Sequence, residues 1–113
     1  MENCIFCKIA NKEIPTNIVY EDDKVMCFHD VNPQAPVHVL LIPKKHITSM
    51  DDIEEEDIDL MGHLLVKVKE IASNLDLEKG YRVVNNCGEY GLQQVMHFHF
   101  HILGKRVMLW PPG

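Results

Sequence analysis

The sequence predicts an α+β fold in which a mainly antiparallel sheet is covered by one long amphipathic helix. Three observations predict this class. Short strand-like segments recur along the 113 residues, and most links between them are of hairpin length. One segment in the middle instead repeats its apolar residues at helical spacing. The chain has no internal repeat and no linker-like stretch, so residues 1–113 are predicted to form a single domain.

The N-terminal third is predicted to contain one short helix and two strands. Asn3 is a good N-cap for a helix over residues 4–10, which would end before the proline at position 15. Residues 17–20 and 24–29 are rich in apolar and β-branched side chains and are joined by an acidic turn. They are therefore expected to pair as a hairpin.

The middle of the chain is predicted to supply a buried strand and the long helix. Residues 38–42 are almost entirely apolar and are followed by Pro43, which is expected to end the strand. Residues 54–75 place their apolar side chains on one stripe, as an amphipathic helix does. That stripe consists of Ile58, Met61, Leu64, Leu65, Val68, Ile71, Ala72 and Leu75. Gly80 then turns the chain into a further strand at 81–85.

The last predicted strand carries the most informative feature of the sequence. From His97 to Leu103, histidines at 97, 99 and 101 alternate with apolar residues. Alternate side chains of a strand point to opposite faces. The apolar face is expected to pack on the helix, while the imidazoles face a ligand. A neutral imidazole has a free lone pair and serves as a nucleophile, base or metal ligand near neutral pH.

Composition excludes several classes of function. The net charge is −6, with acid concentrated at residues 51–59, which argues against broad nucleic-acid binding. No apolar run has the length of a membrane span, and the first residues lack the layout of a secretory signal. A cytoplasmic protein with no nucleic-acid or membrane partner is expected, so its four cysteines are predicted to be reduced.

The alternating histidines, together with segments spread over the whole chain, resemble the histidine triad (HIT) superfamily and, within it, the histidine triad nucleotide-binding (Hint) branch. The segments that carry the resemblance are Cys4–Ile9, Glu13–Pro15, Tyr20–Asp22, Phe28–Asp30, Pro33–Pro36, Ile42–Ile47, His97–Leu103 and Trp110–Gly113.

The resemblance implies a fold, an activity and partners. The fold would be a five-stranded, mainly antiparallel sheet with one long and one short helix, and a homodimer would join two such sheets into ten strands. The activity would be hydrolysis of purine nucleoside 5′-phosphoramidates, and of acyl adenylates, to a nucleoside monophosphate. AMP and GMP are the implied ligands.

The resemblance also assigns roles to individual residues. His99 would attack the α-phosphorus and form a nucleotidyl-histidine intermediate. His101 would donate to a nonbridging phosphate oxygen. Gln93 and the backbone of Gln94 would face the same phosphate, and Asn86 would lie near the phosphate and ribose. As a loop residue, Asn86 is otherwise simply one that tolerates unusual backbone angles.

The remaining implied contacts hold the nucleoside. Asp30 would accept both ribose hydroxyls, and Phe6, Ile9 and Val31 would form the apolar slot for the base, although each is equally suited to a core. Where the family commonly has Gly-Gly-Gln-Ser, this chain has Gly91-Leu92-Gln93-Gln94. Leu92 and Gln94 therefore bring the preference for the leaving group and the rate into question.

Cys4 and Cys7 have the spacing of half a structural zinc site. In some relatives the site is completed by the histidines that correspond to His46 and His97. Such a closed Cys₂His₂ zinc site would anchor the first helix and would not take part in the chemistry. The competing interpretation is two free cysteines and a His46 that forms hydrogen bonds within the site.

Three functions besides the phosphoramidase remain open at the level of sequence. The chain is alternatively a nucleotide-binding or scaffolding protein with incidental hydrolysis, a dinucleoside polyphosphate hydrolase, or a zinc-stabilised structural module. The intact His-x-His-x-His pattern favours an enzyme, because binding alone needs no nucleophile.

Overall fold

A computed structural model describes residues 3–113 and shows a five-stranded antiparallel sheet in the order β1-β2-β3-β5-β4. The strands are β1 (Ile18–Glu21), β2 (Val25–His29), β3 (Val37–Pro43), β4 (Tyr81–Val84) and β5 (Phe100–Gly104). Two α-helices, α1 (Ile5–Ala10) and α2 (Ile58–Asn74), accompany two short 3₁₀ turns, η1 (Met50–Asp52) and η2 (Glu55–Asp57). The predicted α+β class and mainly antiparallel sheet are confirmed.

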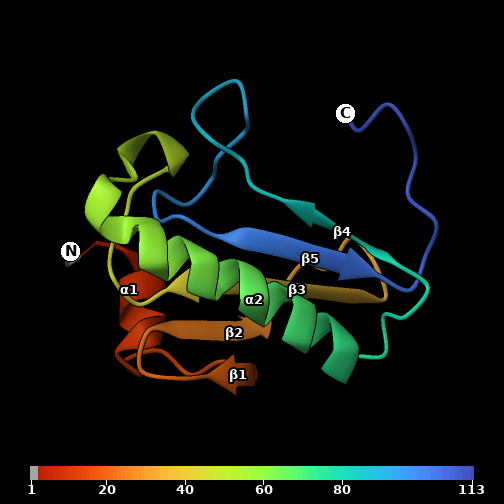
Figure 1. The fold of residues 1–113 in the computed structure, drawn as a ribbon, viewed down its shortest axis with the longest axis horizontal. Coiled ribbons are helices and arrows are strands. Elements are labelled where there is room, and N and C mark those ends of the chain that lie inside the picture. Colours follow the sequence, from red (N-terminus) through yellow and green to blue (C-terminus); the bar gives the residue numbers. More distant parts are fainter. Residues whose placement is uncertain (1–2) are drawn as a thin grey trace.

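The sheet separates two apolar layers, and strand alternation explains why. In β2, Val25 and Cys27 face α2, whereas Met26 and Phe28 face α1. Figure 1 shows α2 running along one face of the sheet, with α1 at the end of the sheet where β2 begins. The larger of the two apolar clusters joins Val25 and Cys27 to the apolar stripe of α2, which supplies Leu64, Val68, Ile71 and Ala72.

Both helices begin later than the sequence predicts. Cys4, not Asn3, is the N-cap of α1, because the Cys4 Sγ accepts the backbone N–H of Cys7 at 3.3 Å. The predicted helix start at Glu54 was wrong by one turn. Glu54 and Asp57 form a capping box around η2, and their reciprocal hydrogen bonds hold this turn ahead of α2.

The last strand also begins later than predicted. β5 starts at Phe100, so His97 and His99 precede the strand. The antiparallel register would place Phe98 opposite Pro43, which has no N–H to donate. The Phe98 N–H instead donates to the carbonyl of Ile47 at 2.6 Å. Phe98 and Ile102 still pack in the α2 layer, so the predicted separation of apolar and histidine faces is confirmed.

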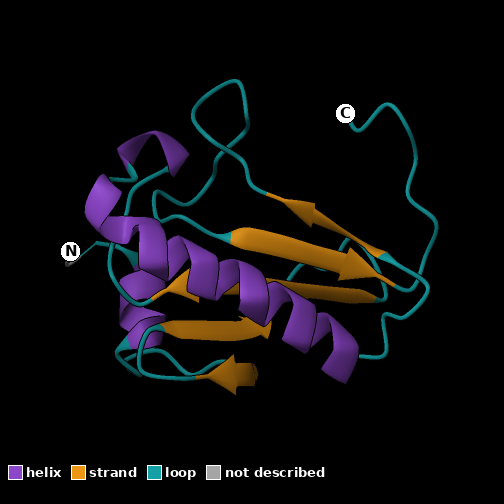
Figure 2. Ribbon diagram, in the orientation of Figure 1, coloured by secondary structure: helices purple, strands orange, loops and turns teal. Residues whose placement is uncertain are grey.

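Two connecting segments near the end of the chain are irregular. Figure 2 shows that the segment between β4 and β5, and the segment after β5, contain neither helix nor strand. His63 of α2 is half-buried and pairs with Asp22 at 2.7 Å across the β1–β2 turn. Within residues 3–113, no helix combines the length and apolar character needed to span a membrane.

Candidate active site and metal centre

A cavity of about 430 Å³ opens at the histidine end of β5, between α1, β2 and the loop before β5. His99 and His101 line it from one side, and Asp30 lines it from the end of β2. Every residue predicted to contact the nucleotide lines this cavity except Gln93. Those that do are Phe6, Ile9, Asp30, Val31, Asn86, Leu92, Gln94, His99 and His101.

His99 is held with one ring nitrogen free. Its Nδ1 lies 2.7 Å from the carbonyl oxygen of His97, so Nδ1 carries the proton and donates it to that carbonyl. Nε2 therefore keeps its lone pair. Burial lowers the pKa of His99 below its usual value, which favours the neutral ring. The Asn85 side chain donates to the His99 carbonyl at 2.9 Å and fixes the backbone.

His101 has the opposite proton arrangement, and His38 of β3 explains it. The backbone N–H of Gln34 donates to His38 Nδ1 at 3.0 Å, so the neutral His38 ring carries its proton on Nε2. His38 Nε2 lies 2.8 Å from His101 Nδ1 and donates to it. The His101 proton is thereby placed on Nε2.

The Nε2–H of His101 is a hydrogen-bond donor without an acceptor in the described part of the protein. This atom is buried and has no hydrogen-bond partner among residues 3–113. A buried donor without a partner is costly unless a ligand satisfies it. Burial, together with the neighbouring His99 and His38, lowers the pKa of His101 to about 4, so the ring is neutral near pH 7.

Asp30, His38 and His101 bring three possible metal-ligand atoms within 4.8 Å of one another. The tautomer of His38 argues against a metal ion there. Its Nε2 carries the proton, and its Nδ1 lone pair already accepts from Gln34, so His38 has no free lone pair for a metal. The three side chains are therefore better described as a hydrogen-bonded group.

Asp30 has one oxygen engaged and one directed toward the histidines. Its Oδ1 accepts the backbone N–H of Asn32 at 2.8 Å, which holds the turn after β2. Its Oδ2 lies 3.4 Å from His38 Nε2. The side chain is largely buried at the edge of the cavity, where a carboxylate accepts hydrogen bonds from neighbouring hydroxyl groups.

The structure places the side chain of Gln93 outside the cavity, contrary to its predicted contact with a phosphate. Its Nε2 donates to the carbonyls of Thr48 and Val95, and its Oε1 accepts the N–H of Gly88. All of these partners are backbone groups, so Gln93 shapes the loop before β5. Sequence alone does not show this, because it depends on which backbone groups approach the side chain.

Leu92 adopts a left-handed backbone conformation with φ of +59°. This region is unfavourable for a residue with a Cβ atom and is tolerated by glycine. The family's usual glycine at this position would thus relieve the strain that Leu92 introduces. Leu92 is 69% exposed at the mouth of the cavity, where its side chain is available to a ligand.

A second cluster lies beside the cavity and contains Cys4, Cys7, His46 and His97. Their four possible ligand atoms all lie within 4.8 Å of one another. His97 Nδ1 is 3.3 Å from Cys4 Sγ and 3.6 Å from Cys7 Sγ, and His46 Nδ1 is 3.3 Å from Cys7 Sγ. Sulfur and nitrogen ligands of a tetrahedral zinc ion are separated by about 3.5 Å, as its bond lengths require.

The orientation of His97 also suits a metal ligand. Its Nε2 lies 2.7 Å from the carbonyl of Pro43 and donates to it, so Nδ1 presents a lone pair to both cysteine sulfurs. Burial and the adjacent Cys4 raise the pKa of the Cys7 thiol to about 11, so metal binding there displaces a proton. The cluster fits a structural zinc ion in donor chemistry and in spacing, and all four donors come from the protein.

The same cluster is coupled to His99 through the backbone. The carbonyl of His97 accepts the Nδ1–H of His99. Holding the His97 ring between Pro43 and the cysteines therefore also holds the group that sets the tautomer of His99. This connection gives the metal centre a positioning role without placing it in the cavity.

His38 is the site residue that sequence reasoning missed. The sequence pattern places it only in a predicted strand, yet it sets the proton position on His101. Its place in β3 offers one signal in retrospect, because β3 pairs directly with β5 and Leu40 lies opposite His101. Phe28 was also not singled out, and it lines the cavity with its ring centroid 5.5 Å from that of Phe6.

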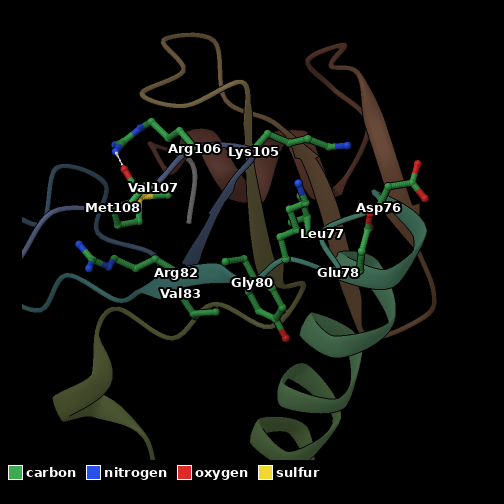
Figure 3. Close-up of a pocket in the computed structure, with 12 residues that line it drawn as sticks. Asp76, Leu77, Glu78, Gly80, Arg82, Val83, Lys105, Arg106, Val107 and Met108 are labelled. Carbon is green, nitrogen blue, oxygen red and sulfur yellow. Dashed lines mark hydrogen bonds between the residues drawn. The ribbon is translucent and has the colours of Figure 1, made fainter.

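A larger cavity, of about 880 Å³, lies at the other end of β5. Figure 3 shows it between the turn that leads into β4 and the segment that follows β5. It is lined by charged and aliphatic side chains, including Arg82, Lys105 and Met108, and by no histidine or cysteine of the described chain. The chemistry of the molecule is therefore assigned to the smaller cavity.

The fold and the site together define a class of protein, a small α+β domain in which two of three alternating histidines line a cavity beside a Cys₂His₂ cluster. A family model described as scavenger mRNA decapping enzyme C-term binding matches residues 3–110. The chain is 55% identical over 113 residues to an uncharacterized HIT-like protein of Synechocystis, covering 99% of this chain and 98% of the relative. The chain belongs to the histidine triad (HIT) family.

Further relatives and solved structures agree. A 14 kDa zinc-binding protein of Zea mays is 52% identical over 111 residues, which is 96% of this chain and 87% of the relative. The crystal structure of a HIT family hydrolase from Legionella pneumophila superimposes with a TM-score of 0.96 at 48% identity, covering 98% of this chain and 100% of that one. A histidine triad protein from Clostridium difficile superimposes with a TM-score of 0.93 at 47% identity, covering 96% of each chain.

Proposed function

We propose that this protein is a hydrolase of the Hint type that cleaves the P–N bond of purine nucleoside 5′-phosphoramidates. The observation that carries the proposal is the pair of complementary imidazoles. His99 presents a lone pair on Nε2, and His101 presents an unpartnered Nε2–H to the same cavity. A nucleophile beside a hydrogen-bond donor is the arrangement that phosphoryl transfer through a covalent intermediate requires.

In the first step, His99 Nε2 attacks the α-phosphorus. A bond forms between this nitrogen and phosphorus, the bond from phosphorus to the amine nitrogen breaks, and the amine leaves with a proton taken from water. His101 donates its Nε2–H to a nonbridging oxygen and stabilises the charge that gathers there. His38 keeps that proton in place by donating to His101 Nδ1.

In the second step, water attacks the phosphorus of the nucleotidyl-histidine. A bond forms between the water oxygen and phosphorus while the bond between phosphorus and Nε2 breaks. The attacking water releases a proton to the solvent, which replaces the proton that the leaving amine took up, and His99 returns to its neutral form with Nδ1–H still donated to the His97 carbonyl. The products are a nucleoside monophosphate and the free amine. Burial supports this cycle because it keeps both rings neutral, and an imidazolium has no lone pair for the attack.

The charge of the cavity favours a phosphoramidate over a dinucleoside polyphosphate. Asp30 is the one residue with a formal charge that lines it, and no lysine or arginine of the described chain does so. A polyphosphate leaving group carries several negative charges that would find no cationic side chain here. A phosphoramidate brings a single charge on the reacting phosphate and an uncharged leaving amine in the transition state.

The rest of the cavity supports a purine nucleoside such as AMP or GMP. Phe6 and Phe28 meet edge to face, and the aliphatic side chains around them complete an apolar slot. Such a slot discriminates by size and accepts either purine. The position of Asp30 at the cavity edge supports its predicted contact with the ribose hydroxyls, and that of Asn86 supports a contact near the phosphate.

Zinc in the Cys₂His₂ cluster completes the proposal. The similarity to a protein named for zinc binding supports this metal at Cys4, Cys7, His46 and His97. Because the protein supplies all four ligands, the metal has no open position for a substrate. Its role is to hold α1 and the His97 backbone in place.

A homodimer is the assembly that the surface supports. β4 is an edge strand whose Tyr81 and Val83 are 41% and 38% exposed. The segment after β5 adds exposed apolar side chains at Val107, Leu109 and Trp110. An unprotected edge beside exposed apolar groups is typical of an interface. Pairing of β4 with β4 of a second copy would extend the five strands to ten.

The decisive experiment compares the wild type with His99→Ala in the release of AMP from adenosine 5′-phosphoramidate. Loss of the nucleophile is expected to lower the rate by about a thousandfold or more. His63→Ala is the matched control, because it removes a half-buried imidazole that pairs with Asp22 outside the cavity. A wild type that binds AMP but releases none from the substrate would favour the nucleotide-binding or scaffolding alternative. Faster release from diadenosine tetraphosphate would favour the polyphosphate hydrolase.

A further inference from the structure

A second hollow adjoins the cavity on the side of the loop before β5. It has a volume of about 530 Å³, and three of its lining residues, Ile5, Gln94 and Val95, also line the histidine cavity. The two hollows therefore meet along a ridge made by these side chains. A molecule that reacts at His99 and extends past this ridge enters the second hollow.

The lining of the second hollow is electrically neutral in its side chains. No aspartate, glutamate, lysine or arginine of the described chain contributes to it. Ile5 and Met96 supply exposed apolar surface, being 47% and 48% exposed, and Thr48 adds a hydroxyl group. Cys4 and His46 also border it, but their ligand atoms belong to the Cys₂His₂ cluster.

We propose that this hollow is the subsite for the amine half of the substrate and that it selects amines with an uncharged aliphatic or aromatic body. The inference rests on the proposed phosphoramidase function. Apolar walls without a charged partner favour an apolar group and disfavour both a carboxylate and a second ammonium group, because either charge would lose hydration without compensation.

Gln94 gives this subsite its polar contact. It lines both the second hollow and the cavity that His99 lines, and it is exposed. An amide offers both donors and an acceptor, so Gln94 is able to hydrogen-bond the leaving nitrogen in either protonation state. The family's shorter serine at this position would not reach as far into the second hollow.

A substitution at Met96 tests the second hollow without changing the lining of the nucleotide cavity. It lines the second hollow and not the first. We would measure kcat/KM for three adenosine 5′-phosphoramidates, one unsubstituted on nitrogen, one derived from phenylethylamine and one derived from 1,4-diaminobutane. In Met96→Glu, kcat/KM for the phenylethylamine compound is expected to fall by about tenfold, as when an apolar contact is lost.

The same variant should raise kcat/KM for the diaminobutane compound several-fold, because its free ammonium group gains an opposite charge. The unsubstituted compound, which does not reach the hollow, should change by less than about twofold. Met50→Glu is the matched control, because Met50 is 46% exposed and lines neither hollow.

The outcomes separate the subsite from the proposed function. No AMP release by the wild type from any of the three compounds overturns the phosphoramidase itself. Release from all three with equal effects of Met96→Glu, or with no effect, overturns the subsite and leaves the phosphoramidase in place. A change that follows the charge of the amine, and is absent in Met50→Glu, supports the subsite.

Discussion

Two backbone groups that are far from each other in the sequence, the His97 carbonyl and the Gln34 N–H, set the proton positions of His99, His38 and His101. The carbonyl of His97 fixes His99, and the N–H of Gln34 fixes His38, which in turn fixes His101. Each ring therefore has one defined tautomer when neutral. The consequence is that a free lone pair on His99 and an N–H donor on His101 lie side by side without either ring being charged.

This arrangement predicts a positioning role for His38 in the proposed reaction. In His38→Ala, His101 Nδ1 loses its donor, and the proton is no longer held on Nε2. We expect kcat to fall by about tenfold to a hundredfold with little change in KM, which is less than the loss of a transition-state donor itself. Nitrogen NMR shifts of His101 should show a mixture of tautomers in place of one.

His38→Gln provides the control for this prediction, because an amide N–H can again donate to His101 Nδ1. It should recover a large part of kcat and the single tautomer. An equal loss of kcat in both variants, with an unchanged tautomer of His101, would show that His38 contributes only to packing in β3.

At the level of residues, sequence reasoning located the cavity but not its hydrogen bonds. The alternation of histidines and apolar residues identified which side chains share a face, because it depends only on strand geometry. The hydrogen bond from His38 to His101, and that from the Gln93 side chain to the Thr48 carbonyl, are contacts between distant segments. Such contacts follow from register and loop path, which local patterns do not encode.

Among the elements, α1 is the one whose position depends on a metal site. It is six residues long, and a helix of that length is not stable on its own. Phe6 and Ile9 pack it on the sheet, and Cys4 and Cys7 tie its first turn to His46 and His97. Because Phe6 lies against His99, with ring centroids 5.1 Å apart, the placement of α1 also shapes the cavity.

Removal of zinc is therefore expected to destabilise the protein. With a strong chelator, the free energy of unfolding should fall by about 3 kcal/mol or more, the linkage expected for a ligand held at a hundred times its dissociation constant. The free energy of unfolding of Cys7→Ala should be as low as that of the chelated wild type, whether or not zinc is present. Denaturant titration monitored by circular dichroism, together with the zinc content of protein purified without added metal, provides the measurement.

Cys87→Ala is the control, since Cys87 is half-buried in the loop after β4 and outside the cluster. It should keep both the zinc and its effect on stability. If the chelator leaves the unfolding of the wild type unchanged and the purified protein holds no zinc, the interpretation of Cys4 and Cys7 as free thiols is correct.

The order of the elements was predictable, whereas their ends were not. Helical periodicity located α2, and apolar runs located the strands, because burial on one face imposes those patterns. The helix starts and the start of β5 were shifted by specific hydrogen bonds, namely the Cys4 cap, the capping box at Glu54 and the Phe98 contact to Ile47. The first two depend on side-chain geometry and the third on the path of a distant backbone segment, and hydrophobic periodicity reports neither.

For the whole molecule, the two sheet edges differ in their protection. β1 has a register irregularity between Ile18 and Tyr20, and Glu21 at its end pairs with Lys12 and Lys44. Bulges and charges of this kind discourage pairing with another chain. β4 runs in unbroken register with β5 and has an aromatic and a β-branched side chain exposed. Assembly is therefore expected at β4, a conclusion that no local sequence pattern supplies.

This asymmetry yields a prediction about the assembly in solution. Val83→Lys places a charge in the proposed β4 interface, where two copies would bring like charges together across the twofold axis. We expect the dissociation constant of the dimer to rise by at least about tenfold, as for an uncompensated charge in an interface. Ile18→Lys is the matched control, since it introduces the same charge at the other edge on a residue 44% exposed. Sedimentation velocity over a range of concentrations measures both variants. A wild type that stays monomeric, or equal dissociation in the two variants, would place the interface elsewhere or exclude it.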